Sequence, residues 1–95
     1  MIKVLIERHC KPDKEEELNK LLEELRSKAL QRYGNYSFET LRSVGDHSVW
    51  LSIASWTSPE DWKAWQSSPE RQEIIGKINM LLFESARESI FGVAR

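Results

Sequence analysis

Residues 56–74 read WTSPEDWKAWQSSPERQEI and contain three of the four tryptophans of the chain. Ser58-Pro59 and Ser68-Pro69 are each followed by a glutamate. Serine before proline is typical of the N-cap and first position of a helix, where the missing proline N–H costs nothing. The stretch therefore predicts two consecutive helices after a strand that ends in Trp56, and the first of these helices is short.

The segments before this stretch predict a β-hairpin. Residues 36–44 (YSFETLRSV) and 48–56 (SVWLSIASW) are rich in aromatic and β-branched residues. They flank a short connection, Gly45-Asp46-His47. Two such runs around a tight polar turn indicate antiparallel strands that pair with each other.

The ends of the chain supply the remaining elements. Residues 2–10 alternate, which predicts a strand with Ile2, Val4 and Ile6 on one side and Lys3, Leu5, Glu7 and His9 on the other. A helix is predicted over residues 13–32, with Asp13 as the N-cap of a capping box and Gly34 just beyond its end. Residues 87–94 (RESIFGVA) are predicted to form the last strand.

The predicted order is β-α-β-β-α-α-β, which is the ferredoxin-like split βαβ topology with one extra helix. We expect an α+β fold in a single domain over residues 1–95, with a four-stranded antiparallel sheet and helices on one face. The other face then stays open, although it carries Leu5 and other large apolar groups. An extended apolar patch usually marks an interface. We therefore expect a dimer whose two sheets face each other and enclose a partly polar cavity in each subunit.

Composition excludes several classes of protein. The chain has 95 residues, of which 40% are hydrophobic and 31% charged, and its net charge is −1. This charge balance leaves no basic surface for nucleic acid. No apolar run approaches the roughly 18 residues of a transmembrane helix. The first residues, MIKVLIERHC, lack the pattern of an export signal, so a cytoplasmic location is expected.

Residues 39–82 resemble the antibiotic biosynthesis monooxygenase family. In that family a strand ends in tryptophan, a Ser-Pro-Glu-like helix start follows, a second tryptophan comes nine residues after the first, and a Ser-Pro-Glu-Arg-like start opens the next helix. Trp56, Trp65 and Ser68-Pro69-Glu70-Arg71 match these features, and the element order extends the resemblance to essentially the whole chain. The resemblance implies a homodimeric ferredoxin-like α/β barrel. Such relatives include cofactor-independent monooxygenases of quinols and polyketide aromatics, heme-degrading monooxygenases, and isomerases of small sugar-like signals.

The resemblance also carries family site residues onto this sequence. Heme-degrading members use an asparagine on the first strand, a tryptophan on the short helix and an iron-binding histidine on the next helix. These positions correspond to Glu7, Trp65 and Ile75, and Ile75 cannot ligate iron. An asparagine that the aromatic-ring oxygenases carry on the short helix corresponds to Asp61. A carboxylate there accepts hydrogen bonds but donates none unless it is protonated.

Each candidate site residue has a structural alternative. Glu7 and His9 share the open strand face, where they can act as a base and its partner or simply be solvated. Trp65 is either a cavity wall that orients a planar ligand or a packing residue. Arg42 is a candidate for binding an acidic or phenolate ligand, and a salt bridge with Glu39 or Glu7 is the alternative.

The remaining motifs offer little chemistry. Cys10 has no second cysteine and no strongly cationic surroundings, which argues against a catalytic thiolate. The two histidines belong to no ligand-spaced metal motif. We therefore expect neither a metal nor a cofactor.

The leading hypothesis is a cofactor-independent monooxygenase that binds a small aromatic molecule, such as a quinol or polyphenol, with Glu7, His9 and Trp65 as catalytic residues and Arg42, Trp65 and Asp61 as substrate-binding residues. The alternative is a non-catalytic ligand-binding or stress-associated dimer of the same fold. Heme degradation is a third reading, which lacks its iron ligand.

Overall fold

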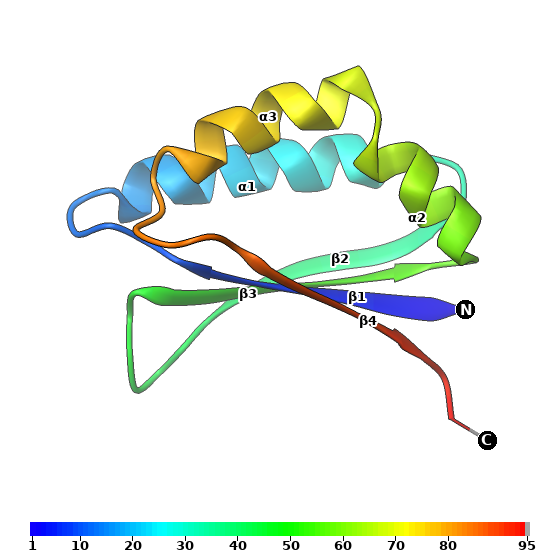
Figure 1. Ribbon diagram of the computed structural model, residues 1–95, viewed down its shortest axis with the longest axis horizontal. Coiled ribbons are helices and arrows are strands. Elements are labelled where there is room, and N and C mark those ends of the chain that lie inside the picture. Colours follow the sequence, from blue (N-terminus) through cyan, green and yellow to red (C-terminus); the bar gives the residue numbers. More distant parts are fainter. Residues whose placement is uncertain (95) are drawn as a thin grey trace.

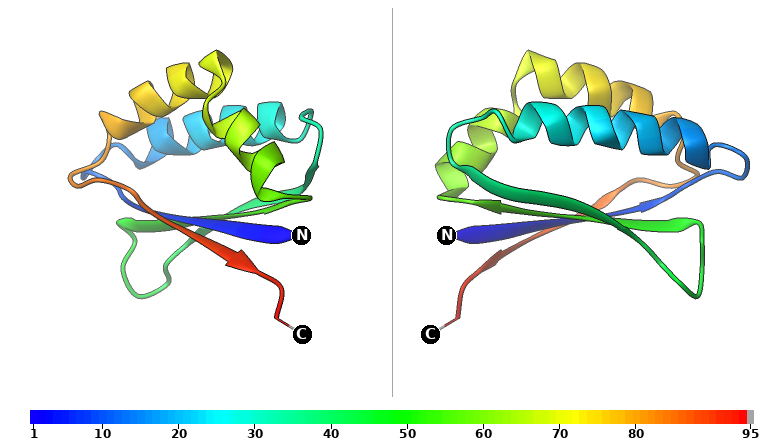
Figure 2. Two further views of the ribbon diagram at one scale, coloured as in Figure 1. Left: turned by 45° about the vertical axis from the view of Figure 1, so that its right-hand side comes forward. Right: turned by 180° about the vertical axis from the view of Figure 1, so that it is seen from behind.

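The computed structural model describes residues 1–94 and contains seven elements: β1 (Ile2–His9), α1 (Glu15–Ala29), β2 (Asn35–Arg42), β3 (Val49–Trp56), α2 (Pro59–Gln66), α3 (Pro69–Asn79) and β4 (Arg87–Gly92). The strands form one antiparallel sheet in the order β2-β3-β1-β4. All three helices lie on one face of this sheet (Figures 1 and 2). The predicted ferredoxin-like α+β fold is confirmed.

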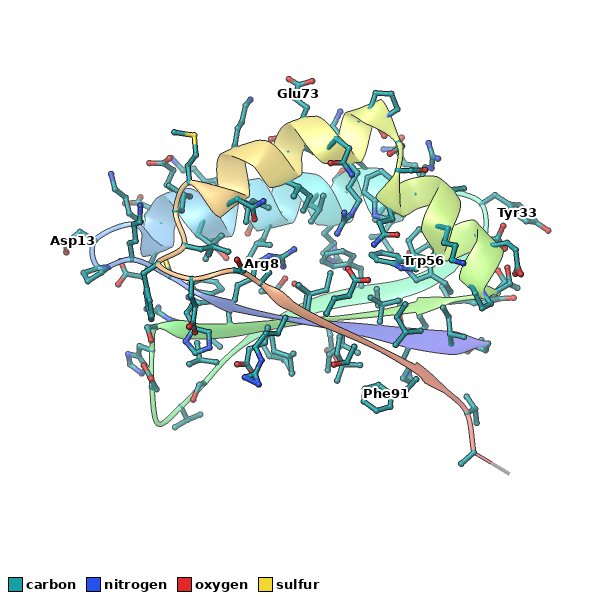
Figure 3. All side chains as sticks on the ribbon, viewed as in Figure 1. Arg8, Asp13, Tyr33, Trp56, Glu73 and Phe91 are labelled. Carbon is teal, nitrogen blue, oxygen red and sulfur yellow. The ribbon has the colours of Figure 1, made fainter. Side chains whose placement is uncertain are left out.

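The two faces of the sheet follow the alternation of β1. We call the face toward the helices the covered face and the opposite one the open face. Ile2, Val4 and Ile6 are buried on the covered face, and the residues between them are at least partly exposed. Figure 3 shows the same division, with Arg8 and Trp56 between sheet and helices and Phe91 on the open face.

The core fills the space between the covered face and the helices. α1 contributes Leu18, Leu22, Leu25 and Ala29, which recur at helical spacing and are all buried. Trp56 closes the core at the end of β3, and its ring meets that of Trp62 edge-on, with 5.9 Å between centroids. Burying one such large apolar side chain contributes roughly 1.5–3 kcal/mol.

The predicted N-caps agree with the structure for two of the three helices. Ser58 Oγ accepts the Asp61 backbone N–H at 3.2 Å, and Ser68 Oγ accepts the Arg71 backbone N–H at 3.2 Å. Both predicted Ser-Pro caps are therefore confirmed. The predicted capping box at Asp13 is wrong, because Lys14 is the N-cap of α1 and no side chain caps it.

Asp13 instead adopts a left-handed backbone conformation, with φ of 65°. This conformation differs from the extended one that an N-cap residue needs, and aspartate tolerates it better than most side chains. The helix that follows starts two residues later than predicted and ends at Ala29. Three glutamates in its first turn complement the helix dipole in place of a cap.

Gly34 begins the hairpin, and its geometry demands glycine. Its φ is 89°, a left-handed conformation that glycine adopts readily. The predicted place of Gly34 just beyond the end of the helix is wrong, because α1 already ends at Ala29 with Leu30 as its C-cap. A Cβ added there would lie 2.6 Å from Oδ2 of Asp61, so a side chain would also collide with α2. The carbonyl of Gly34 accepts the backbone N–H of Thr57 at 2.7 Å, which ties the start of β2 to the end of β3.

The segment after α3 is fastened to the end of β1. The Lys11 backbone N–H donates to the Leu81 carbonyl at 2.8 Å, and the Phe83 N–H donates to the His9 carbonyl at 3.1 Å. The chain then continues into β4, an edge strand exposed along its whole length. These bonds bring residues 82–86 over the end of the sheet, where the candidate site lies.

Candidate functional site

A pocket of about 550 Å³ opens between the covered face of the sheet, α3 and the segment that leads into β4. Its apolar lining consists of Ile6, Ile75, Leu82, Phe83 and Ala86. Its charged lining consists of Arg8, Arg71, Glu84 and Glu88. We call it the arginine pocket, because the two arginines are its most buried charged groups. Its volume lies within the range of roughly 300–1,000 Å³ typical of small-molecule sites.

Arg8 reaches the pocket because it continues the inward parity of β1 beyond Ile6. The side chain is only 2% exposed. One guanidinium nitrogen, Nη1, donates to Ser52 Oγ on β3 at 3.1 Å, whereas Nε is buried without a hydrogen-bond partner. Burial, and next the neighbouring charge of Arg71, lower the pKa of Arg8 to about 10. Arg8 therefore remains a cation at neutral pH, held in an environment that disfavours its charge.

Arg71 approaches the same pocket from the first turn of α3. It is 6% exposed, and its guanidinium carbon lies 5.0 Å from the ring centroid of Trp62. Its Nε also lacks a hydrogen-bond partner. Burial lowers the pKa of Arg71, and the carboxylate of Glu88 opposes that shift. Within residues 1–94, neither Arg8 nor Arg71 has a carboxylate within ion-pair distance.

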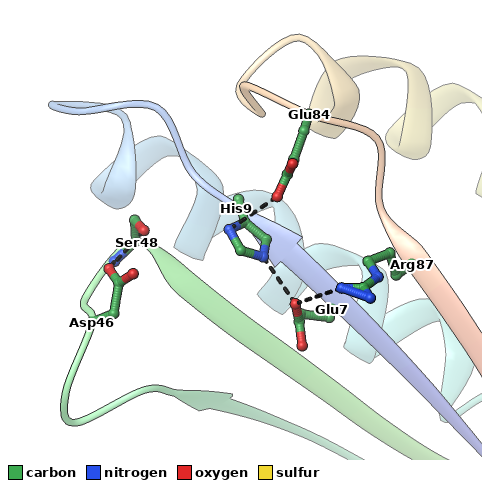
Figure 4. A network of polar contacts seen from close by, with 6 residues as sticks. All are labelled: Glu7, His9, Asp46, Ser48, Glu84 and Arg87. Atoms are coloured by element: carbon green, nitrogen blue, oxygen red, sulfur yellow. Dashed lines mark hydrogen bonds and ion pairs between the residues drawn. The ribbon is translucent and has the colours of Figure 1, made fainter.

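A chain of charged groups runs from the pocket rim to the open face (Figure 4). Glu84, which lines the pocket, has Oε1 3.1 Å from Nδ1 of His9. Nε2 of His9 lies 2.9 Å from Oε2 of Glu7, and Arg87 Nη1 is 4.0 Å from that same oxygen. Phe83 supports the imidazole edge-on at a centroid distance of 5.5 Å. With a carboxylate at each ring nitrogen, His9 donates to both when protonated and to only one when neutral.

Glu7 and His9 thus meet on the open face of the sheet, which is the face that the alternation of β1 predicted for them. There Glu7 lines only a shallow hollow of about 230 Å³. Ile75, in contrast, lines the arginine pocket on the covered side. Glu7 and Ile75, which the family resemblance placed at two catalytic positions of the heme-degrading relatives, therefore lie on opposite sides of the sheet and share no site.

Trp65 lies in the core and does not line the arginine pocket. It is 1% exposed, and the guanidinium carbon of Arg32 lies 5.5 Å from its ring centroid. Asp61 accepts a hydrogen bond from the Ser58 hydroxyl at 3.1 Å and packs against Gly34. These contacts belong to packing and to the start of α2. The packing alternative weighed for Trp65 matches its position.

Arg42 lies at the far end of β2 with its own partners. Its Nε donates to the His47 carbonyl at 2.7 Å, and its guanidinium carbon lies 4.9 Å from the ring centroid of Trp50. Its ion pair is with Glu15, at 3.9 Å, and not with Glu39 or Glu7, the partners named as the alternative to ligand binding. The reason is parity, since Arg42 pairs with Trp50 and faces α1, whereas Glu39 and Glu7 are on the open face.

Other reactive groups stay apart from the pocket. Burial raises the pKa of the Cys10 thiol, which keeps it protonated at neutral pH. Within residues 1–94 no three histidine, cysteine or acidic side chains gather closely enough to hold a metal ion. Over the same residues, no helix combines the length and the apolar character needed to cross a membrane.

Sequence reasoning missed both arginines, although each left a signal. Arg8 follows Ile2, Val4 and Ile6 at the same parity, so the alternation of β1 already predicted a charged side chain on the covered face. Arg71 precedes Ile74 and Ile78 at helical spacing, on the apolar face of α3. Glu84 had no such signal, because it lies between elements and its position depends on tertiary contacts.

Comparison with solved structures shows the same fold in proteins of low sequence identity. A structure of an antibiotic biosynthesis monooxygenase superposes with a TM-score of 0.92 at 16% identity and covers 100% of both chains. A conserved protein from Methanosarcina mazei Go1 gives a TM-score of 0.91 at 18% identity, covering 95% of this chain and 89% of its own. SnoaB, a cofactor-independent oxygenase from Streptomyces nogalater, was solved as a mutant and gives 0.89 at 12% identity, with 99% and 93% covered.

The family assignment comes from the sequence. No relative among the curated proteins matches the chain. The family model for antibiotic biosynthesis monooxygenase matches residues 1–77, which include β1, the hairpin, both tryptophan-bearing elements and most of α3. The chain belongs to the antibiotic biosynthesis monooxygenase family.

Proposed function

We propose that this protein is a cofactor-independent monooxygenase that oxidises a planar, electron-rich aromatic substrate, of quinol or polyphenol type, in the arginine pocket. The observation that carries the proposal is the pocket itself, which combines apolar walls, two buried cations and a carboxylate on its rim. The family and the description of SnoaB as a cofactor-independent oxygenase support the same class of reaction.

Binding would place the aromatic ring against Ile75 and Leu82. An ionised substrate oxygen or carbon centre would then lie within the field of Arg8 and Arg71. Fixed cations in a site of low polarity stabilise such an anion more strongly than water does. The pocket therefore favours the deprotonated substrate, which is the form that reacts with dioxygen.

Glu84 is the proposed proton acceptor, and His9 is its partner. The Glu84 carboxylate lines the pocket, and His9 contacts it from the other side. Glu7, on the open face, contacts the other ring nitrogen of His9 and is the next group in this row of charged side chains. In this scheme Glu84 takes the role of base that the sequence assigned to Glu7 or His9, His9 remains the partner of the base, and Glu7 lies one residue further from the substrate. Trp65 supports α2 from the core.

The oxidation needs no electron source besides the substrate. The substrate anion gives one electron to dioxygen, and the resulting radical pair combines to form a carbon–oxygen bond in a peroxide. The proton taken up by Glu84 returns to the peroxide anion, and loss of water from the resulting hydroperoxide, at a carbon that still bears hydrogen, leaves a carbonyl. One oxygen atom enters the product, the other leaves in water, and all four electrons come from the substrate.

We propose further that the protein acts as a homodimer through its open face. Leu5 and Ile53 are paired across β1 and β3 at the centre of that face, and Leu51 lies beside them on β3. Phe91, at the edge of the same face, is 55% exposed. A second copy of the sheet would remove these side chains from water.

The test is oxygen consumption by purified protein with a panel of quinols, polyphenols and anthrones. We expect uptake above the uncatalysed rate and one atom of isotopically labelled dioxygen in the product. Glu84→Gln, which keeps the shape but removes the base, is expected to lower turnover by about 100-fold. Glu73→Gln, on the outer surface of α3 (Figure 3), is the matched control and should leave turnover unchanged.

Tight binding of these compounds with no oxygen uptake would contradict the proposed reaction. That outcome would instead support the non-catalytic ligand-binding dimer. A heme-degrading role has no support in this pocket, because the wall residue at the position of the family's iron-binding histidine is Ile75.

A further inference from the structure

The arginine pocket holds two cations and leaves both without a counter-ion. Arg8 and Arg71 are each more than nine-tenths buried, yet no ion pair within residues 1–94 involves either of them. Their Nε–H groups are buried without acceptors. Burial of a charge without a partner is costly, and buried cations are normally paired. Two adjacent unpaired guanidinium groups indicate a site built to receive an anion.

Glu88 is the carboxylate placed to modulate this site. It lines the pocket from β4, and its charge raises the pKa of both arginines. Its oxygens are held by Gln66 Nε2, at 3.2 and 3.4 Å, rather than by a guanidinium. Glu88 thus offsets part of the positive charge without occupying the arginines' hydrogen-bonding positions.

We infer that the substrate of this pocket carries a carboxylate in addition to its aromatic ring. The inference rests on the proposed function for the identity of the ring and on the two arginines for the charged group. Guanidinium groups bind carboxylates through two parallel hydrogen bonds, a geometry that a single phenolate oxygen cannot match. The carboxylate lies between Arg8 and Arg71, and the ring extends along Ile75 and Leu82. Glu88 opposes binding by repulsion.

The experiment uses a pair of probes with the same ring. Gentisate is a hydroquinone that bears a carboxylate, and methyl gentisate is the same hydroquinone with that charge removed. Titration calorimetry on the full chain should give an affinity for gentisate at least about 10-fold higher than for the ester, as expected for a charge-assisted contact. Arg71→Gln should abolish this preference.

A second variant keeps the inference falsifiable if Arg71→Gln does not fold. Glu88→Gln removes a nearby negative charge at an exposed position, so it should tighten gentisate binding several-fold and leave the ester unchanged. Arg32→Gln is the matched control. Arg32 lies over Trp65 as Arg71 lies over Trp62, but outside the pocket, and its substitution should change neither affinity.

Three results would overturn the inference: equal affinity for the two probes, binding of neither probe by folded protein, or an unchanged gentisate affinity in both pocket variants. Displacement of gentisate by inorganic phosphate at equal concentration would also overturn it, since the ring would then contribute nothing. Failure of the proposed reaction looks different. Arginine-dependent gentisate binding without oxygen uptake would leave the carboxylate site intact, whereas uptake with neutral quinols alone would leave only the reaction intact.

Discussion

Each face of β1 contains one residue that departs from the polarity of its neighbours, and the two departures are of opposite kind. On the covered face, Arg8 follows three apolar residues into the core and has no anionic partner there. On the open face, Leu5 lies between Lys3 and Glu7 and continues onto Ile53 of β3. A charge where apolar groups belong indicates a ligand site, and an apolar group where charges belong indicates an interface. The same strand therefore carries both proposed functions, one on each face.

The largest expected effect is the loss of stability when a core side chain of the covered face is truncated. Trp56→Ala removes a fully buried side chain and its contact with Trp62, so the free energy of unfolding should fall by about 4 kcal/mol. Urea unfolding followed by circular dichroism measures this change. Tyr33→Ala, at an 87% exposed position, should cost less than about 0.5 kcal/mol. Similar losses at the two positions would contradict the proposed core.

The next effect concerns the open face. Ile53→Lys places a charge at the centre of the proposed interface. The dissociation constant of the dimer should therefore increase by on the order of 100-fold or more, while the monomer stays folded. Analytical ultracentrifugation across a concentration series measures it. Gln31→Lys adds the same charge at an exposed position and should leave the mass distribution unchanged. A monomeric wild type would remove the basis of the comparison.

A smaller effect of opposite sign is expected at Arg8. Arg8→Met removes a buried, unpaired charge and keeps an apolar side chain of similar length. The free energy of unfolding should therefore rise by about 1 kcal/mol, while gentisate binding is lost. Arg26→Met, at an exposed arginine of α1, should bring no such gain. Destabilisation by Arg8→Met would mean that Arg8 serves the fold rather than the ligand.

The smallest effect is the pH dependence of the difference in unfolding free energy between Arg8→Met and wild type. Burial lowers the pKa of Arg8 to about 10 in the folded chain, below its ordinary value, so the unfolded state binds more protons in the pH window between the folded-state and the ordinary pKa. The contribution of Arg8 to stability therefore rises with pH in this window and is least favourable below it. The advantage of Arg8→Met over wild type should shrink by about 1 kcal/mol on going from neutral pH to about pH 11. Comparing the two proteins cancels the titration of other groups, and a constant difference would contradict the lowered pKa.

Sequence patterns predicted most of the fold because they report local physics. Alternation in β1, helical spacing in α1 and the Ser-Pro starts of α2 and α3 were each sufficient to identify their elements. The start of α1 was predicted wrongly, since Asp13 satisfied the motif but adopted a left-handed backbone conformation. A motif of residue types does not specify the backbone angles that a cap requires.

The site was predicted less completely, and the reason is the distance in sequence between its parts. The contact between Glu7 and His9 follows from strand parity alone. The pocket brings together Arg8, Arg71 and Glu84, which come from a strand, a helix and a connecting segment. No local pattern links residues so far apart.

The sequence by itself determined which residues face the helices and which face away, because side-chain direction along a strand or helix follows from its period. Only the tertiary structure decided that the two inward-facing arginines converge, and that the segment after α3 folds back onto the end of β1 to place Glu84 beside His9. Convergence depends on how helices cross the sheet and where loops are fastened. Those contacts are set by packing across the whole core rather than by any short stretch of residues.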